Sequence, residues 1–415
     1  MDIIAATIGV TIVWGGVSKY LPKVVIKPLV VIGKNTMLIL RLHYFRYCTL
    51  DVIKERAEME KKTKEIGYIS YCKGIAMICI FLAHAPQAVS WIDNKWTAWG
   101  ANGVKLLFVI SGFLTAKSYL KSDTKIKVFW KKRFWRLAPL YWCAIMFWHI
   151  IYVIDDQRMV TSFMTEHDVK AILLNIFLLN GVLVYGNNSV VPGGWYVGAI
   201  VGFYLFTPLI IKLVYVVWKK SSMLVRGIPV VIWSVTYIVS WSINHFTFMK
   251  QISTVLQIYY STLFQLPSLL IGILLFLELS ENKVIGENNG IIQAVAIILL
   301  GSLAYYSTYV NSDYSQIAYG YLSYLFIILI SKSYSKIEKS GILVEKLGHV
   351  SYEFFLVHLF YTIVIIPCLS EFLIKYINKI AAFGISTLIS LIASYFSAIA
   401  INYARMKIEA RISWI

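Results

Sequence analysis

A lysine and a histidine within one apolar segment are the first residues whose types and spacing could do chemistry. Lys73 and His84 lie eleven residues apart in the string YCKGIAMICIFLAH, 71–84. On an α-helix, eleven residues bring both side chains to within about 20° of one face, with about 16 Å between them along the axis. Ionisable groups inside membrane helices usually serve an internal site, and imidazole can take up a proton near neutral pH. The pair predicts an internal acid–base site, and the alternative is a lysine reaching the interface and a histidine bonded to a neighbouring helix.

Two arginines form a second candidate site. Arg133 and Arg136 are spaced three apart in FWKKRFWRLAPLYW, 129–142, so they are neighbours on one helix face. Guanidinium groups bind phosphate through two parallel hydrogen bonds, and two such groups could hold a pyrophosphate or a sugar phosphate. The alternative is a basic loop that only sets topology, which explains the neighbouring lysines well.

Small residues in GVKLLFVISGFL, 103–114, indicate a close contact between helices. Ser111 and Gly112 interrupt an otherwise apolar helix, where small side chains let a neighbouring backbone approach. Lys105 lies near the external end of the same segment, where its long side chain can reach the interface. Close packing alone would also explain Ser111.

Two later strings add candidates for lining a substrate path. Trp195 and Tyr196 follow a Pro-Gly-Gly break in PGGWYVGAIVGFYLFTP, 192–208, and such a break is tolerated in a membrane only where protein or water satisfies the freed backbone groups. Ser351 and His358 are seven residues apart in LGHVSYEFFLVHLF, 347–360, and so share a helix face. Aromatic anchoring at the interface and a structural histidine are the alternatives.

The composition of the chain indicates that membrane-spanning segments hold these residues. The chain has 415 residues, 59% hydrophobic and only 14% charged, which excludes an ordinary soluble protein. The formal charge of +18 is typical of membrane spans joined by basic cytoplasmic loops, and no soluble domain is available to present a basic face to nucleic acid. The five cysteines have no CxxC spacing, so neither a disulfide nor a metal site is expected.

The predicted fold class is all-α, a polytopic membrane helix bundle of about ten transmembrane helices with one short re-entrant or buried segment. The apolar segments long enough to span are 68–90, 103–119, 136–154, 193–217, 226–243, 257–277, 289–309, 315–331, 351–368 and 381–402. The positive-inside rule then places both ends of this core domain in the cytoplasm. An eleventh run, 170–186, would reverse the later loops if it crossed, so we expect it to be re-entrant or buried, with Asn175 and Asn180 lining a polar cavity.

The first part of the chain looks like a partial internal copy. The string IGKNTMLILRLHYF, 32–45, resembles LGHVSYEFFLVHLF, 347–360, with His43 matching His358. Arg41 interrupts the copied helix, which favours a relic or an appended accessory helix over a second working site. Deletion of residues 1–47 is therefore expected to leave activity intact. The predicted organisation is the copy at 1–53, a basic cytoplasmic linker at 54–67, the membrane domain at 68–402 and a cytoplasmic tail at 403–415.

Taken in order over about 68–370, these strings resemble the acyltransferase 3 family of bacterial integral-membrane O-acyltransferases. The resemblance implies a ten-helix domain that takes an acyl group, usually acetyl from acetyl-CoA, and places it on hydroxyls of cell-envelope or exported carbohydrates. It implies acetyl-CoA or another acyl-CoA as co-substrate, with no permanently bound cofactor and no metal. By the matching positions, His84 is the catalytic residue, Arg133 and Arg136 with Lys73 bind the acyl-CoA, and Ser111, Trp195 and His358 lie near the pore. From their own motifs, Tyr196 and Ser351 are added to the pore or substrate-lining residues.

Two positions depart from the family's pattern. Lys73 stands where the first-span motif usually has arginine, which keeps the charge and loses the two-pronged fork. Ile200 stands where many members have glutamate, so no carboxylate from that helix can orient His84.

The sequence therefore predicts a multi-pass enzyme of the bacterial plasma membrane. Its expected partners are membrane lipid, acyl-CoA, a carbohydrate acceptor such as an exopolysaccharide, and polysaccharide-assembly proteins. A different class remains open, a proton-coupled secondary transporter or glycan flippase that uses Lys73 and His84. Against it, no inverted repeat is visible in the sequence. A purely structural membrane subunit would leave the ionisable residues within the spans unexplained.

Overall fold

The computed structural model describes most of the chain after residue 66. The chain divides into two compact units, 1–66 and 67–415, and the first lies wholly outside the described residues. The predicted N-terminal copy and most of the predicted span 289–309 are therefore outside them as well. Described are residues 67–87, 89–92, 99–120, 126–154, 168–183, 185–245, 258–281, 295, 298–299, 301–302 and 312–411.

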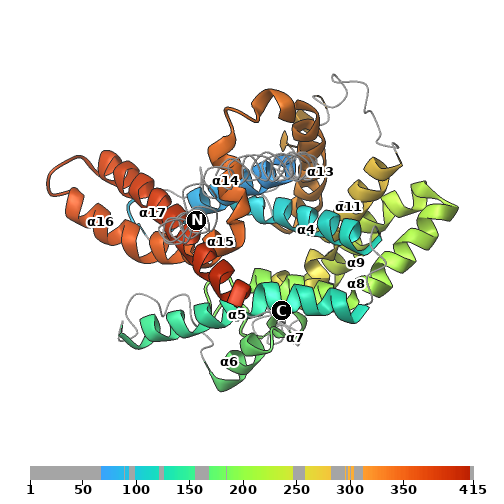
Figure 1. Ribbon diagram of the computed structural model, residues 1–415, viewed down its shortest axis with the longest axis horizontal. Coiled ribbons are helices and arrows are strands. Elements are labelled where there is room, and N and C mark those ends of the chain that lie inside the picture. The colour runs from blue at the N-terminus through green and yellow to red at the C-terminus, as the bar shows by residue number, and fades with distance from the viewer. Residues whose placement is uncertain are drawn as a thin grey trace, which may run out of the picture. The chain divides into compact units, whose positions relative to one another are not determined.

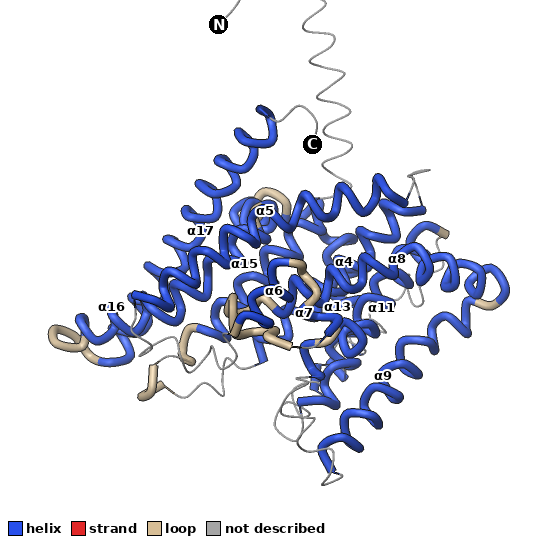
Figure 2. Tube along the Cα trace, turned by 90° about the horizontal axis from the view of Figure 1, so that it is seen from below, coloured by secondary structure: helices blue, strands red, loops and turns tan. Residues whose placement is uncertain are grey.

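Helices make up the architecture of this part of the chain, and Figure 2 shows helices and loops with no strand among the described residues. Nine helices there are long and apolar enough to cross a membrane, and they correspond to nine of the ten predicted segments. The prediction of an all-α polytopic bundle is confirmed. The labelled long helices are α4 (Gly103–Leu120), α5 (Ile126–Ile154), α8 (Trp195–Lys220), α9 (Ser222–His245), α11 (Thr262–Ser280), α13 (Ser312–Ile337) and α17 (Lys379–Arg411).

Two further membrane helices complete the nine. The first helix, Gly67–His84, carries no label in the figures and is called here the entry helix. The other runs as α15 (Ser351–Phe360), one π-helical turn η4 (Tyr361–Ile365) and α16 (Ile366–Leu373). The short elements are η2 (Trp99–Asn102), α6 (Val169–Ile176), α7 (Asn180–Leu183), η3 (Ile258–Tyr260) and α14 (Ile342–His349).

Helix boundaries differ from the predicted ones at two places that matter for the site. The entry helix ends at His84, six residues before the predicted end, because Pro86 lacks the N–H that would continue the helix. α5 begins at Ile126, ten residues before the predicted start, so Arg133 and Arg136 lie on a helix and not in a loop.

The segment 170–186 does not cross as a helix. It forms α6 and α7, of eight and four residues, which are too short to span. Asp168 caps α6 by accepting a hydrogen bond from the Ala171 N–H at 2.7 Å and another from the Tyr185 hydroxyl at 2.5 Å. These bonds, the Tyr185 hydroxyl first, hold the pKa of Asp168 below its usual value.

Asn175 and Asn180 are both fully buried, as the prediction of a buried segment requires. The Asn175 amide donates to the backbone carbonyls of Ala171 and Gly186 and accepts from the Tyr141 hydroxyl at 2.6 Å. It therefore fixes the loop against α5. Neither residue lines the two cavities described below, and the expectation that they line a polar cavity stays a prediction.

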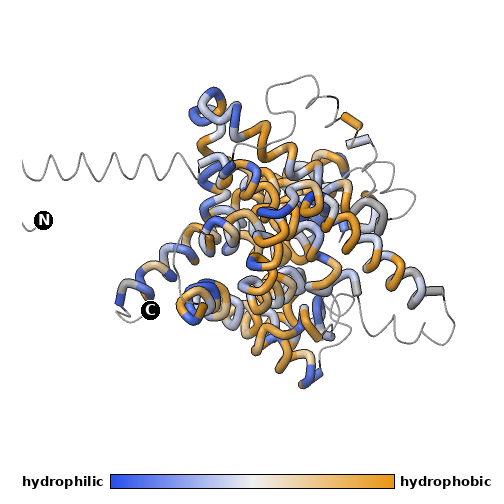
Figure 3. Tube along the Cα trace, turned by 90° about the vertical axis from the view of Figure 1, so that its right-hand side faces the viewer, coloured by the Kyte–Doolittle hydropathy of each residue, from blue (hydrophilic) through white to orange (hydrophobic). Residues whose placement is uncertain are grey.

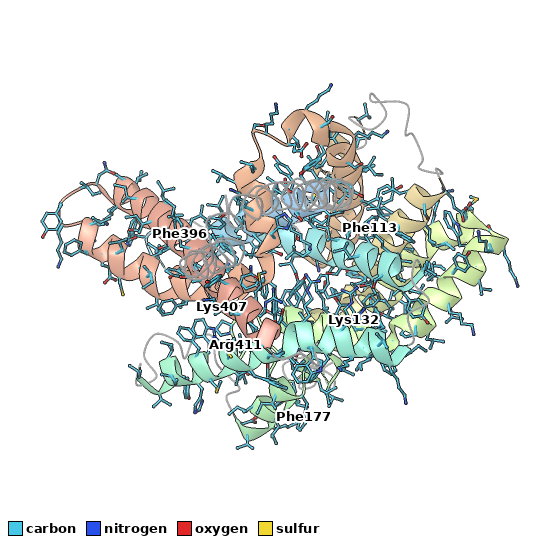
Figure 4. All side chains as sticks on the ribbon, in the orientation of Figure 1. Phe113, Lys132, Phe177, Phe396, Lys407 and Arg411 are labelled. Carbon is cyan, nitrogen blue, oxygen red and sulfur yellow. The ribbon has the colours of Figure 1, made fainter. Side chains whose placement is uncertain are left out.

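The outer faces of the long helices are apolar. Large hydrophobic side chains on α5, α9 and α17 are exposed, among them Ile150, Val231 and Phe396, the last labelled in Figure 4. Figure 3 shows hydrophobic colours along most of the helices and hydrophilic ones toward the end of α17. Exposed apolar surface on this scale indicates contact with lipid.

Close packing of α4 on α11 forms the centre of the bundle, and both helices lie side by side in Figures 1 and 2. A Cβ on Gly112 would lie 2.0 Å from the Leu269 carbonyl oxygen, and a Cβ on Gly272 would lie 2.0 Å from that of Val109. The expected role of Gly112 in close helix approach is confirmed.

Replacing Gly112 with alanine is expected to destabilise the protein by about 1–3 kcal/mol, because the added methyl group meets backbone that cannot move aside. Gly384→Ala on α17 is the matched control, since nothing lies within 4 Å of its Cβ position, and it should stabilise its helix by up to about 1 kcal/mol. Thermal unfolding in detergent measures both, and equal midpoints for the two variants would contradict the packing.

Candidate functional site

Three cations meet in one small cavity, called here the cation cavity. Lys73 from the entry helix and Arg133 and Arg136 from α5 line a space of about 90 Å³. No acidic residue of the described part of the chain lines it, and its other residues are Leu107, Ile110, Ser111, Leu114, Leu137, Tyr196, Ile200, Tyr204, Ser351, Tyr352 and Phe355. The structure thus brings together six of the nine site residues expected from the sequence, from five different helices.

Aromatic rings hold the first arginine in place. The Arg133 guanidinium lies 5.4 Å from the centroid of the Phe129 ring and 5.0 Å from that of Tyr204. Both contacts are within cation–π range, so the side chain is oriented before any ligand arrives. The Tyr352 hydroxyl, from another lining residue, donates to the Leu137 carbonyl at 2.8 Å and ties α15 to α5.

Hydroxyl groups complete the wall of the cation cavity. Ser111 on α4 is close enough to Tyr196 on α8 for a hydrogen bond between their side chains. The Tyr196 ring packs on Phe355 at 4.8 Å and on Phe108 at 4.9 Å. With Ser351 these groups offer neutral donors beside the three cations.

The cation cavity suits an anion. Ligand pockets for whole cofactors measure about 300–1,000 Å³, so this one can take a phosphate-sized group and not an entire nucleotide. Two arginine forks and one ammonium group favour phosphate oxygens over neutral groups. Ile200 forms part of the wall, where a carboxylate would have opposed such a ligand.

A pair of histidines forms a second centre. The rings of His84, the last residue of the entry helix, and His358 on α15 lie 5.6 Å apart. The Phe354 ring stacks on His358 at 6.1 Å with an interplanar angle of 5° and also contacts Phe81 of the entry helix. The two histidines are separated by 274 residues in sequence, and α15 brings them together.

The hydrogen bonds of His358 fix its protonation pattern. It is fully buried, and its Nδ1 donates to the Phe355 carbonyl at 2.7 Å, because a carbonyl oxygen can only accept. Its Nε2 has no hydrogen-bond partner in the described part of the chain. A buried acceptor nitrogen therefore lies beside His84.

Phe355 lies between the two centres. It lines the cation cavity, and its ring is 5.5 Å from that of His358. Lys73 and His84 both face α15, as their spacing predicted, but Lys73 lines the cation cavity and His84 contacts the second histidine. The entry helix thus supplies one residue to each centre.

Trp195 belongs to neither centre. Gly193 before it has a φ of +76°, which glycine adopts at little cost, and this turn starts α8 directly after the predicted break. The Trp195 ring lies 5.1 Å from Tyr260 and 5.8 Å from Tyr259, at the end of the bundle where α8 and α11 begin. Burial raises the pKa of Tyr260 above its ordinary value. These three rings are called here the aromatic cluster.

Lys105 contacts the aromatic cluster through the Tyr259 ring. The expectation that it reaches the interface is wrong, because only 1% of it is exposed. Its ammonium group donates to the Gln265 side-chain carbonyl and lies 5.0 Å from the Tyr259 ring, and these contacts replace water. The sequence did not connect Gln265 with Lys105, because the two lie 160 residues apart.

A larger apolar groove adjoins the second arginine. It measures about 600 Å³ between α5, α15 and α17, and Arg136 lines both this groove and the cation cavity. A buried ion pair, Glu353 with Arg405 at 3.0 Å, lies at the groove's edge, and only 2% of the Glu353 side chain is exposed. Arg136 is therefore reachable from the groove as well as from the cavity.

Comparison with known proteins shows which family the chain belongs to. A protein named "Putative O-acetyltransferase" from Staphylococcus aureus strain COL is 26% identical over 231 residues, which is 52% of this chain and 35% of the relative. One of the same name from strain MSSA476 is 25% identical over the same shares. The chain thus matches about a third of the length of these relatives, and no solved structure matches it significantly. The family model described as an acyltransferase domain matches residues 66–401, and the chain belongs to this acyltransferase 3 family.

Proposed function

We propose that the protein is an O-acyltransferase of the bacterial plasma membrane that moves an acyl group, acetyl in the first instance, from acyl-CoA to a hydroxyl of a cell-envelope or exported polysaccharide. Family membership and the names of the relatives support the reaction class. The observation that carries the proposal is the cation cavity near the histidine pair, with Phe355 contacting both.

The donor binds through its phosphates. In this proposal Lys73, Arg133 and Arg136 hold phosphate oxygens of acyl-CoA on the cytoplasmic side, where the basic loops are expected. The cavity is too small for the nucleotide, which stays outside it. The thioester arm passes Phe355 toward His84, which lies about 16 Å from Lys73 along the entry helix.

The acceptor reacts at the histidine pair. His84 takes the proton of an acceptor hydroxyl as general base, and the alkoxide oxygen forms a bond to the thioester carbonyl carbon. The carbon–sulfur bond then breaks, and the thiolate leaves and takes up a proton. The second histidine offers its unpartnered Nε2 to the same hydroxyl region, which supports a positioning role for His358.

The aromatic cluster supports a carbohydrate acceptor. Trp195, Tyr259 and Tyr260 gather at the end of the bundle where α8 and α11 begin, which the predicted topology places outside the cytoplasm. Half-buried aromatic rings of this kind present an apolar face together with polar edges, as recognition of a sugar ring needs. The polysaccharide would approach from this side.

The test uses purified protein in lipid vesicles with acetyl-CoA labelled in the acetyl group. An acyltransferase should release CoA and leave label as an ester on added glycan or as free acetate. Absence of binding and of turnover would contradict the proposal, and proton-coupled movement of glycan under the same conditions would support a transporter in its place.

A further inference from the structure

His84 is held by a residue of its own turn. Its Nδ1 lies 3.0 Å from the side-chain oxygen of Gln87, three residues on. The backbone N–H of Gln87 also donates to the His84 carbonyl, at 3.1 Å. Pro86 lies between them and restricts the turn, because its ring fixes φ. Backbone and side chain of Gln87 thus both bind His84.

The direction of this bond sets the chemistry of the ring. An amide oxygen can only accept, so Nδ1 must carry the proton, and the lone pair of the neutral imidazole is then on Nε2. When Nε2 takes up a proton, the Nδ1–H bond to Gln87 persists. In the described part of the chain no carboxylate hydrogen-bonds to His84. Ile200, at the position where many family members have glutamate, lines the cation cavity.

We infer that Gln87 is the positioning residue of the site, which holds His84 in the tautomer whose Nε2 is the base. The inference rests on the proposed function, in which His84 is the catalytic residue. A neutral amide fixes the ring as a carboxylate would, but it stabilises the imidazolium less. His84 therefore stays in its basic form to a lower pH than a histidine paired with a carboxylate.

Among the described neighbours of His84, Gln87 is the residue that accepts the hydrogen bond from its Nδ1. Among the residues that the structure describes, the titratable group facing His84 from a packed helix is His358 of α15, whose Nδ1–H is already donated to the Phe355 carbonyl. The phenyl ring of Phe354 lies parallel to the His358 ring, with 6.1 Å between their centroids, and offers no acceptor. Lys73 is on the same helix, about 16 Å away along the axis.

The test compares Gln87→Met, which keeps the length and removes the acceptor, with Gln87→Glu, which supplies a charged one. Rates of acetyl transfer by purified protein in vesicles are measured from pH 5 to 9. Gln87→Met is expected to lower kcat about tenfold with the KM for acetyl-CoA unchanged. Gln87→Glu should retain activity, with the acidic limb of its pH profile about one pH unit higher, because a carboxylate favours the imidazolium that cannot act as base. Ser90→Ala, at an exposed position of the same turn region, is the control and should behave as wild type.

The possible outcomes test the inference on Gln87 and the proposed function separately. An unshifted acidic limb in folded Gln87→Glu, or wild-type kcat in Gln87→Met, overturns the inference and leaves the proposed function standing. Equal losses in both variants with one common pH profile also overturn it, because they show a structural role alone. Full activity of His84→Ala in the same assay would overturn the proposed function itself.

Discussion

Replacing His84 with alanine is expected to lower kcat for acyl transfer by about 10²–10⁴-fold, the usual contribution of a general base. The His84 ring, held by Gln87, supplies the nitrogen that takes the hydroxyl proton. His358, the other histidine of the pair, is fully buried. The KM for acetyl-CoA should change little, since the cation cavity lies on the other side of Phe355. Steady-state rates of ester formation on the glycan measure the effect.

His349→Ala is the matched control for this substitution. His349 ends α14, about half of its side chain is exposed, and it lies 3.4 Å from Glu345 on its own helix. Its loss should leave kcat unchanged at equal protein level in the membrane. Acetylation by His84→Ala at the wild-type rate would remove this histidine from the mechanism.

Replacing both Arg133 and Arg136 with glutamine is the second large prediction, a rise in the KM for acetyl-CoA of at least about 100-fold. A hydrogen bond to a charged group contributes about 1.5–3 kcal/mol, and each 1.4 kcal/mol is a factor of ten in affinity. The double variant removes two such groups from a cavity in which Lys73 is the remaining cation among the described lining residues. Titration with acetyl-CoA and with CoA alone measures the loss.

The variant Lys132→Gln tests whether the basic stretch binds acetyl-CoA or only sets the membrane topology. Lys132, labelled in Figure 4, is exposed on α5 and does not line the cation cavity, yet it carries the same charge in the same basic stretch. Its KM should equal that of wild type. Arg136→Lys should still raise the KM, because an ammonium group cannot reproduce the fork. A KM in the double arginine variant no higher than in Lys132→Gln would show that the stretch serves topology alone.

The helices were largely predictable from the sequence. Nine of the ten expected spans appear because a lipid-exposed backbone must satisfy its own hydrogen bonds, so length and apolarity suffice to locate each helix. The ends of the helices were less predictable, because individual residues near each end decide where the helix stops. Pro86 ends the entry helix early, and α5 continues back through the basic stretch to Ile126.

Parts of the site followed from spacing on single helices. The three-residue spacing of Arg133 and Arg136 and the shared face of Lys73 and His84 agree with their contacts in the structure. The buried Lys105 did not follow, since the partner that makes its burial possible, Gln265, is on another helix. Gln87 could have been found from its position one turn after His84, but nothing in the sequence shows that its side chain turns back.

The sequence by itself determined the membrane helices, the residue types at the centres and the face each residue takes on its own helix. Only the tertiary structure decided that His358 meets His84, that Lys73 joins the two arginines, and that Trp195 stands apart with Tyr259 and Tyr260. The physical reason is that helical periodicity fixes angles about one axis, whereas the choice of the facing helix depends on packing. Close approaches such as Gly112 against the Leu269 carbonyl set that choice, and they involve residues far apart in the chain.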